Sequence, residues 1–337
     1  MRTSDFDYHL PPELIAQEPV EPRDSARLLL VSRGAGALAH HRVRDLPSLL
    51  RPGDLLVLND TRVMAARLLG VRADTGGRAE LLLLREHDDG AWSALVRPGR
   101  AATPGRQYRL KASDGPLTAT VRSRQEDIAI VAFDRPIDPA SAGSVPLPPY
   151  IQGFEGDPER YQTVYAREAR SAAAPTAGLH FTPGLFERLQ SAGVEREFLT
   201  LEVGAGTFRP VRTEDPAEHA LPPERYLLPP ATAEAIRGAR AEGRRVIATG
   251  TTVVRTLEHA LGPAAGAPEG ETALFIRPGH TFTAVDALLT NFHLPRSTLL
   301  MLVSAFAGHD LIREAYAEAI RERYRFYSFG DAMLILP

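Results

Sequence analysis

The chain of 337 residues contains no cysteine, one tryptophan and, at Lys111, a single lysine. Without cysteine it cannot form disulfide bonds, thiolate nucleophiles, cysteine-ligated zinc sites or iron–sulfur clusters. One lysine gives little support to Schiff-base catalysis. Contacts with phosphate groups must therefore be made by arginine, which supplies nearly all the basic side chains.

The chain also lacks the long apolar runs that cross a membrane. No apolar stretch approaches the roughly 20 residues that a bilayer requires, and residues 1–5 lack the regions of a signal peptide. We therefore expect a cytoplasmic protein with no membrane partner. The net charge of -3 neither supports nor excludes a nucleic-acid partner, because a local basic patch is enough to bind phosphates.

The composition, with 44% hydrophobic and 24% charged residues, is typical of a folded globular protein. Hydrophobic cores stop growing beyond roughly 250 residues, so this length predicts two domains. We expect a discontinuous α/β domain over residues 1–66 and 150–337. An inserted β domain is expected over residues 67–149.

The inserted domain is predicted from short apolar segments separated by turn residues. Its strand candidates are residues 79–85, 92–96, 117–121 and 128–133. Closely spaced strands without helical periodicity indicate a small antiparallel barrel or sandwich. We expect the barrel.

Helices and strands alternate after residue 150, which predicts an α/β fold with a largely parallel sheet and flanking helices. Helices are expected after Thr182, from Thr232, from Ser297 and over residues 311–323. Buried strands are expected over residues 54–58, 198–203 and 245–249. Ligands in such sheets bind at the carboxyl ends of the strands, where four segments carry polar residues.

The first of these segments, residues 173–181, surrounds Thr176, Gly178 and His180 with small residues. Small residues let a ligand approach the backbone, and a histidine can act as a base or a donor near neutral pH. A histidine merely packed beside a loop fits the same pattern. Both interpretations stay open at this point.

The second segment, residues 201–208, places Glu202, Gly204, Gly206 and Thr207 after a predicted strand. It resembles the first nucleotide-binding motif of Rossmann methyltransferases, although the third glycine of that motif is missing. A tight turn that uses glycine for a positive φ explains the pattern equally well.

The third segment, residues 250–256, leads from a strand into a helix and contains Thr251, Thr252 and Arg255. Backbone N–H groups at such a helix start favour a carboxylate or a phosphate. Simple capping of the helix by one of the threonines is the alternative.

The fourth segment, residues 289–298, places Asn291 and His293 before an apolar helix. Polar groups beside so buried a helix must be paired or functional. No two histidines in the chain have the spacing of a metal-binding helix, so we expect no metal.

Further segments extend the pattern along the whole chain: residues 5–11, 23–29, 59–63 with Arg62, 147–151, 161–165 and 324–333 with Asp331. Together with the four candidate segments, and in the same order, they resemble the S-adenosylmethionine:tRNA ribosyltransferase-isomerase family of queuosine biosynthesis. The resemblance covers residues 5–335. One departure is visible where the family has a Met-His-Ser-Glu run after a histidine. His219, Glu224 and Tyr226 are present, but Pro222 and Pro223 replace the inner histidine and serine.

The resemblance implies a reaction between S-adenosylmethionine and tRNA. The 7-aminomethyl group of a 7-deazaguanine at the anticodon wobble position acquires an epoxycyclopentanediol unit, which gives epoxyqueuosine-tRNA with release of adenine and methionine. S-adenosylmethionine is then a co-substrate, and no prosthetic group or metal is expected. The sulfonium acidifies the neighbouring ribose 5′ C–H, so a positioned base is enough to remove that proton.

Site residues follow as expectations from the resemblance and from side-chain chemistry. His180 or His293 is expected to be the base or the acid that assists adenine, with Asp331 and Glu202 as the next candidates. Arg255, Thr251 and Thr252 suit the methionine carboxylate. The remaining substrate-binding candidates are Thr176, Gly178, Gly204, Gly206, Thr207, Asn291 and Arg62.

Two alternatives use the same features. A Rossmann methyltransferase would release S-adenosylhomocysteine and no free adenine, and a non-catalytic tRNA-binding protein would consume no S-adenosylmethionine. Two basic clusters are candidates for contact with the tRNA backbone, although such clusters are often only solvated surface. They are Arg97, Arg100, Arg106, Arg109 and Lys111, and Arg321, Arg323 and Arg325. Nothing in the sequence demands more than a monomer.

Overall fold

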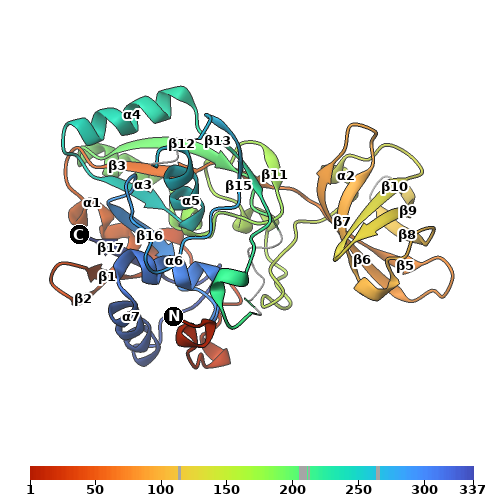
Figure 1. Ribbon diagram of the computed structural model, residues 1–337, viewed down its shortest axis with the longest axis horizontal. Helices are drawn as coiled ribbons and strands as arrows, with labels where there is room; N and C mark the ends of the chain where they lie inside the picture. Colours follow the sequence, from red (N-terminus) through yellow and green to blue (C-terminus); the bar gives the residue numbers. More distant parts are fainter. Residues whose placement is uncertain (113–114, 205–210, 212, 263–265) are drawn as a thin grey trace. The chain divides into compact units, whose positions relative to one another are not determined.

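The computed structural model describes residues 1–112, 115–204, 211, 213–262 and 266–337, and it divides the chain into two compact units (Figure 1). The α/β unit comprises residues 1–61, 149–167 and 174–337. The barrel unit comprises residues 62–148 and 168–173.

A nine-stranded mixed sheet forms the centre of the α/β unit. In spatial order the strands are β15 (Glu269–Thr272), β13 (Glu224–Leu227), β12 (Glu195–Leu201), β3 (Leu55–Asn59), β14 (Val246–Thr249), β16 (Ala287–Asn291), β17 (Ala332–Leu336), β1 (Arg27–Ser32) and β2 (Ala37–Arg42). The four central strands β12, β3, β14 and β16 are parallel, whereas β17 runs antiparallel to β16. The predicted α/β class is confirmed, with parallel pairing concentrated in the middle of the sheet.

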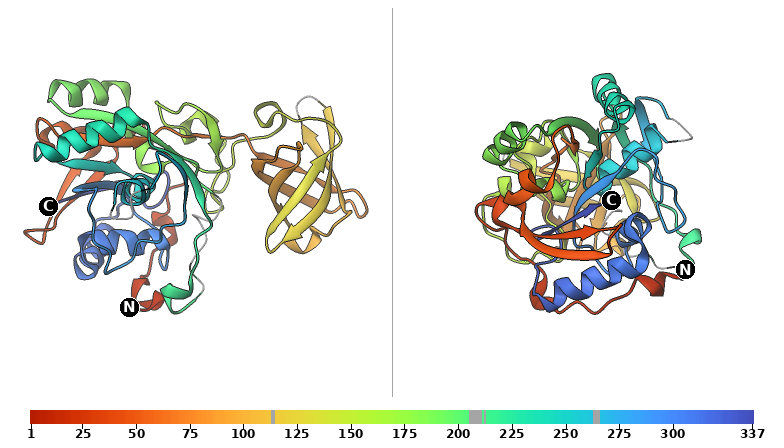
Figure 2. Two further views of the ribbon diagram at one scale, coloured as in Figure 1. Left: turned by 45° about the horizontal axis from the view of Figure 1, so that its top comes forward. Right: turned by 90° about the vertical axis from the view of Figure 1, so that its left-hand side faces the viewer.

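The central strands are buried on both faces. Every residue of β3, β14 and β16 is buried, which explains why their sequences read as continuous apolar runs. One core cluster joins these strands to α1 (Leu46–Leu49) and α3 (Pro183–Ser191). Helix α4 (Pro230–Ala241) contacts β12 and β14, α5 (Thr251–Ala260) contacts β3 and β14, and α6 (Thr298–Ala307) packs against α5 and α7 (His309–Arg321) (Figure 2).

Helix starts follow the local capping chemistry. Thr182 and Ser297 accept hydrogen bonds from the backbone N–H groups of Leu185 at 3.1 Å and Leu300 at 3.2 Å, as expected for N-caps of α3 and α6. Thr232 instead donates to the backbone oxygen of Phe198 at 2.8 Å, and α4 begins earlier, at Pro230. Among the described residues, no helix is both long and apolar enough to cross a membrane.

Short 3-10 helices connect these elements. They are η1 (Thr3–Phe6), η2 (Pro12–Leu14), η3 (Arg23–Ser25), η4 (Val43–Asp45), η5 (Gly99–Ala101), η6 (Pro158–Tyr161), η7 (Thr176–His180) and η9 (Pro216–Glu218). Helix η7 carries the first candidate segment and contacts β16.

The barrel unit is a closed antiparallel barrel of six strands (Figure 2). In spatial order they are β10 (Ile128–Phe133), β7 (Trp92–Arg97), β6 (Arg78–Glu86), β5 (Arg67–Arg72), β8 (Gln107–Ala112) and β9 (Gly115–Gln125). A short α2 (Pro139–Ala142) also belongs to this unit. The predicted inserted barrel is confirmed, and the sandwich alternative is excluded because the sheet closes on itself.

Two barrel strands, β5 and β8, are absent from the sequence prediction. In β8 buried and exposed residues alternate, but its outward positions are charged or polar, which hides the strand in a search for apolar runs. Gly70 on β5 has a specific reason to be glycine, since a Cβ there would lie 2.1 Å from the backbone oxygen of Arg109 on β8. Strand pairing therefore depends on a residue that contributes no apolar surface.

The edges of the barrel unit differ from the predicted range of 67–149. The two-residue strand β4 (Arg62–Val63) pairs in parallel with β11 (Ala169–Ser171), and both belong to this unit. Met64 and Ala66 pack into the barrel core. The unit consequently begins at Arg62 and includes a second segment, residues 168–173.

Candidate functional site

The carboxyl ends of the central strands bring the four candidate segments to one edge of the sheet. Strands β12, β3, β14 and β16 end at Leu201, Asn59, Thr249 and Asn291. Strand β17 runs in the opposite direction, so Asp331, just before it, reaches the same edge. In sheets with a parallel centre this edge is where ligands bind.

Asn291 links His180 to Thr176 at this edge. Its side-chain nitrogen lies 3.3 Å from His180 Nε2 and donates to the backbone oxygen of Tyr327 at 3.2 Å. Its side-chain oxygen accepts from the Thr176 hydroxyl at 2.9 Å. Because an amide nitrogen can only donate, His180 Nε2 is the acceptor, and the neutral ring carries its proton on Nδ1.

His180 is held neutral by its surroundings. Burial, with a smaller contribution from the positive charges of Arg23 and Arg325, lowers its pKa from 6.5 to about 4. Arg23 itself donates to the backbone oxygens of Glu159, Gln162 and Leu179. His180 and Arg23 border a cavity of about 20 Å³, which has room for about one water molecule. At neutral pH the ring is therefore neutral, with Nδ1 as a donor, and Nε2 can take up a proton once the hydrogen bond from Asn291 is released.

Gly178, two residues before His180, makes room for the side chains of Thr163 and Tyr165, which both carry hydroxyl groups. A Cβ at position 178 would lie 2.0 Å from the hydroxyl oxygen of Tyr165 and 2.9 Å from Cγ2 of Thr163. Within the described part of the chain, both hydroxyl oxygens are buried without a hydrogen-bond partner. Burial raises the pKa of Tyr165, so it keeps its proton and can donate it to a ligand.

The start of α5 lies at the same edge. Gly250 precedes the helix with a φ of 91°, and neither Thr251 nor Thr252 caps it, so the capping alternative is wrong. Thr252 instead accepts a hydrogen bond from Asn59 at 3.4 Å. Asn59 also pairs with both backbone groups of Leu201, at 3.1 and 3.0 Å, and so ties β3, β12 and α5 together.

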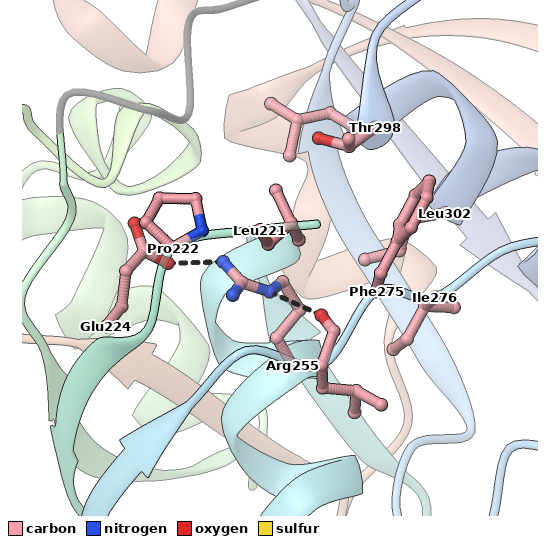
Figure 3. Close-up of a pocket in the computed structure, with 10 residues that line it drawn as sticks. Leu221, Pro222, Glu224, Arg255, Phe275, Ile276, Thr298 and Leu302 are labelled. Carbon is pink, nitrogen blue, oxygen red and sulfur yellow. Dashed lines mark hydrogen bonds and ion pairs between the residues drawn. The ribbon is translucent and has the colours of Figure 1, made fainter. Parts of the chain in front are cut away.

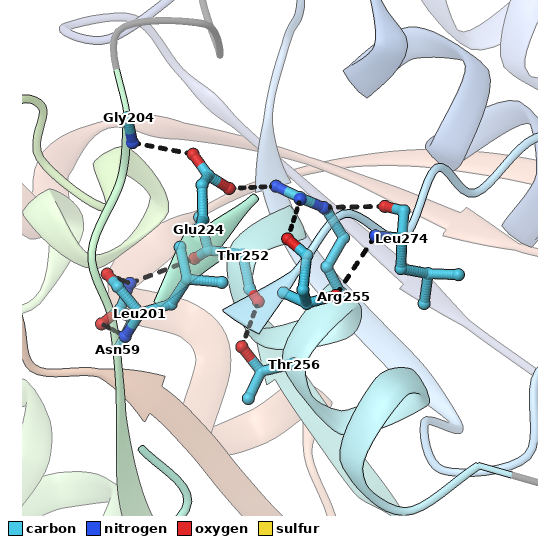
Figure 4. Close-up of polar contacts among 9 residues, drawn as sticks. Asn59, Leu201, Gly204, Glu224, Thr252, Arg255, Thr256 and Leu274 are labelled. Carbon is cyan, nitrogen blue, oxygen red and sulfur yellow. Dashed lines mark hydrogen bonds and ion pairs between the residues drawn. The ribbon is translucent and has the colours of Figure 1, made fainter. Parts of the chain in front are cut away.

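Arg255 on α5 forms a buried ion pair with Glu224 (Figure 4). Glu224 is 5% exposed and Arg255 is 6% exposed. The other oxygen of Glu224 accepts from the backbone N–H of Gly204 at 2.7 Å, and Arg255 Nε donates to the backbone oxygen of Leu274 at 3.0 Å. The guanidinium is thus engaged by the protein itself and holds the chain just after β12 in place.

A cavity of about 10 Å³ adjoins this ion pair (Figure 3). Leu221 and Pro222 border it together with Phe275 and Leu302. Pro222 is one of the two prolines at which the chain departs from the pattern described above. The departure therefore lies directly beside the buried Glu224–Arg255 pair.

His293 and Asp331 have their polar atoms engaged in local structure. The His293 ring nitrogens lie 3.1 Å from the Thr290 hydroxyl and 3.4 Å from the Tyr316 hydroxyl, and burial lowers its pKa to about 3. The two carboxylate oxygens of Asp331 accept from the backbone N–H groups of Arg27 and Arg325, each at 2.8 Å. Burial raises the pKa of Asp331, and these two hydrogen bonds oppose the increase.

Of the remaining predicted residues, Glu202 directly follows β12, and the others lie in the barrel unit or outside the described residues. The backbone N–H of Glu202 donates to the backbone oxygen of Arg225 at 2.9 Å. Gly206 and Thr207 lie outside the residues that the structure describes. Arg62 belongs to strand β4 of the barrel unit. In the described ranges, no three His, Asp or Glu side chains are grouped as a metal site requires.

Comparison with known proteins adds the family. The family model described as "Queuosine biosynthesis protein" matches residues 3–335. The chain belongs to this family. Two relatives named S-adenosylmethionine:tRNA ribosyltransferase-isomerase are similar over nearly their whole length. The one from Symbiobacterium thermophilum is 55% identical over 100% of both chains, and the one from Thermus thermophilus is 57% identical over 98% of both.

A solved structure supports the same relationship. The chain is similar to the crystal structure of S-adenosylmethionine tRNA ribosyltransferase from Thermotoga maritima, with 41% sequence identity and a TM-score of 0.58. The similarity covers 99% of this chain and 100% of that chain. The family assignment thus rests on sequence and on structure.

Five residues of the site were not predicted individually. Arg23, Asn59, Thr163, Tyr165 and Glu224 all lie in segments that carry the family resemblance or its departure. The resemblance marked these segments, but no local pattern distinguishes a residue that reaches the sheet edge from its neighbours. Only the tertiary contacts separate them.

Proposed function

We propose that this protein transfers and isomerises the ribosyl part of S-adenosylmethionine onto the 7-aminomethyl group of 7-aminomethyl-7-deazaguanine at the wobble position of a tRNA. The products are epoxyqueuosine-tRNA, adenine and methionine. The observation that carries the proposal is the set of relatives with the ribosyltransferase-isomerase name at 48–57% identity over nearly the full chain. The protein is expected to act in the cytoplasm as a monomer.

The proposed chemistry starts at the sulfonium. Its positive charge acidifies the ribose 5′ C–H, so a base can take this proton. Cleavage of the glycosidic bond then releases adenine, which takes up a proton. The 7-aminomethyl nitrogen forms a bond to a ribosyl carbon and loses a proton, and cleavage of the carbon–sulfur bond releases methionine as its neutral thioether. None of these steps requires a metal.

His180 is our candidate for the proton-transferring group. It lies at the ligand-binding edge of the sheet, and its depressed pKa keeps the ring neutral near pH 7. Asn291 and Thr176 fix the ring by the chain of hydrogen bonds between them. Glu202 is the second candidate. His293 and Asp331 are proposed to position the edge, because their polar atoms contact protein groups.

The methionine carboxylate is proposed to bind at the start of α5. Its first backbone N–H groups, with the hydroxyls of Thr251 and Thr252, suit an anion. Arg255 is proposed to act through Glu224 and Gly204, because its guanidinium already has protein partners. The unpaired hydroxyls of Thr163 and Tyr165 suit the ribose hydroxyls or the base.

The deciding experiment is chromatography of the small molecules released when the purified protein is mixed with S-adenosylmethionine and tRNA carrying the aminomethyl-deazaguanine. Adenine and methionine released together, and only with that tRNA, is the expected result. Release of S-adenosylhomocysteine would instead indicate a methyltransferase. Absence of any turnover would leave the non-catalytic tRNA-binding protein as the alternative.

A further inference from the structure

Charge is distributed unequally between the two units. The barrel unit contains 14 arginines and lysines and 11 aspartates and glutamates, a formal charge of +3, whereas the whole chain has -3. The α/β unit must therefore be acidic. Such asymmetry within one chain is the footprint expected of a nucleic-acid surface on the basic part.

The excess positive charge lies at one end of the barrel. All neighbouring strands are antiparallel, so the ends of β5, β7 and β9 meet the starts of β6, β8 and β10. Six arginines lie at or next to these positions, and we call this set the basic end: Arg72, Arg78, Arg97, Arg100, Arg106 and Arg124. Arg124 donates to the backbone oxygen of Gly99 at 2.9 Å, which confirms that β9 and the loop after β7 meet there.

Carboxylates at the basic end are fewer than its arginines: Asp74 lies in the turn between β5 and β6, and Glu126 and Asp127 form the turn between β9 and β10. Asp74 lies 3.6 Å from Arg106. Glu80 is opposite Arg97 in the strand register but forms its ion pair with Arg67, at 2.8 Å. Arg78, Arg97 and Arg100 are exposed, and no ion pair joins them to another residue of the described barrel.

The opposite end of the barrel differs in charge and in connections. Strand β5 begins there and β10 ends there, so the chain enters and leaves the barrel at that end. The turn between β6 and β7 at that end carries Asp88 and Asp89, and Asp89 pairs with Arg122. The basic end is consequently free of the connections that enter and leave the barrel.

The barrel lacks exposed aromatic side chains within its described residues. Its tryptophan and tyrosine, Trp92 and Tyr108, are buried in the barrel core, and Phe133 is partly buried against it. The described barrel therefore offers no exposed aromatic ring on which an unpaired base could stack, whereas contact with a phosphate backbone needs only exposed cations. The side chains at the basic end therefore suit the sugar–phosphate backbone of an RNA.

We propose that the basic end of the barrel binds the sugar–phosphate backbone of the tRNA substrate without reading its sequence. That the bound RNA is a tRNA rests on the proposed function, whereas the binding surface itself is inferred from the charges of the barrel. The second basic cluster of the chain is less suitable, because Arg321 pairs with Glu318 and Glu322, and Arg325 donates to the backbone oxygen of Glu18.

The test compares three variants with the parent protein by fluorescence anisotropy with a labelled, unmodified tRNA transcript at several salt concentrations. The test variant combines Arg78→Ala, Arg97→Ala and Arg100→Ala. The control for loss of exposed arginines outside the barrel combines Arg237→Ala and Arg240→Ala on α4 in the α/β unit. A third variant replaces the three barrel arginines with lysine. Thermal unfolding and calorimetric binding of S-adenosylmethionine establish that each variant is folded.

The alanine variant is expected to bind tRNA about 10- to 100-fold more weakly near physiological salt. The slope of log K against log salt should become shallower by about 2 to 3, since each lost phosphate contact removes about 0.9. The lysine variant should retain most of the affinity, and the control should bind as the parent protein does. In turnover, KM for tRNA should rise while kcat at saturating tRNA stays the same.

Unchanged affinity and salt slope in the alanine variant would overturn the proposal. So would an equal loss in the α4 control, or failure of lysine to restore binding. These binding results do not depend on turnover. Failure of adenine and methionine to appear would remove the proposed function and leave the result on the barrel surface interpretable.

Discussion

The α/β unit and the barrel unit both carry many arginines, but the two units use them differently. Arg23 and Arg255 in the α/β unit donate to backbone oxygens or pair with a buried carboxylate. Arg78, Arg97 and Arg100 in the barrel unit are exposed. A buried arginine fixes its neighbours, whereas an exposed one remains available to a polyanion. Residue type alone therefore does not identify a ligand contact.

The largest expected effect is on catalysis at the edge of the α/β sheet. His180→Asn removes the ring that Asn291 orients and should lower kcat for adenine release by about 10²- to 10⁴-fold with the fold intact. The control is His41→Asn on β2, a partly exposed histidine, which should leave kcat unchanged. Full activity of His180→Asn would remove this residue from the mechanism.

The next largest effect is the loss of stability when a buried arginine is replaced, compared with the loss when an exposed arginine is replaced. Arg255→Leu leaves Glu224 buried without its partner and should lower the free energy of unfolding by about 3–5 kcal/mol. Arg122→Leu in the barrel breaks an exposed pair with Asp89, which solvent screens, and should lower stability far less than Arg255→Leu does. Urea denaturation of both variants measures the difference. Similar losses in the two variants would contradict the comparison.

A smaller effect is expected from pH. The pKa values of His180 and His293 are about 4 and about 3 in the folded protein, below the ordinary 6.5. The unfolded chain takes up protons as the pH falls below 6.5 while the folded chain does not, so stability is lost from pH 6.5 toward pH 4. At pH 5 the loss should be roughly 2 kcal/mol for each histidine.

Hydrogen exchange at pH 7 and pH 5 checks this prediction unit by unit. Amides of the α/β unit should lose protection at pH 5. Those of the barrel should change less, because His180 and His293 both belong to the α/β unit. Equal loss of protection in both units would argue against the buried histidines as the cause.

The smallest effect concerns two glycines that are crowded for different reasons. Gly178→Ala brings a Cβ against the Tyr165 hydroxyl and should lower stability by about 1–3 kcal/mol, with part of the loss regained by Tyr165→Phe. Gly70→Ala in the barrel meets the backbone oxygen of Arg109, so Arg109→Ala should not restore it. Thermal unfolding of the four variants tests this. Recovery in the barrel, or none at position 178, would contradict it.

The sequence by itself determined the fold class, the inserted barrel, several of the helices and buried strands, and the segments that reach the sheet edge. These properties depend on local chemistry: apolar runs bury strands, threonine and serine cap helices, and turn residues separate short strands. Thr182 and Ser297 cap α3 and α6 as predicted. Thr232 has a competing hydrogen-bond partner in Phe198, and α4 begins at Pro230, two residues before its predicted start.

Only the tertiary structure decided the partners within those segments. His180 and His293 look equivalent in sequence, but the first meets Asn291, 111 residues away, while the second is held by Thr290 and Tyr316. The sequence suggests that Arg255 contacts a ligand, but in the structure its guanidinium pairs with Glu224, 31 residues before it. The direction of the barrel strands likewise gathers six separate arginines at one end. Local pattern determines which residues reach a surface, whereas long-range packing determines what each of them contacts there.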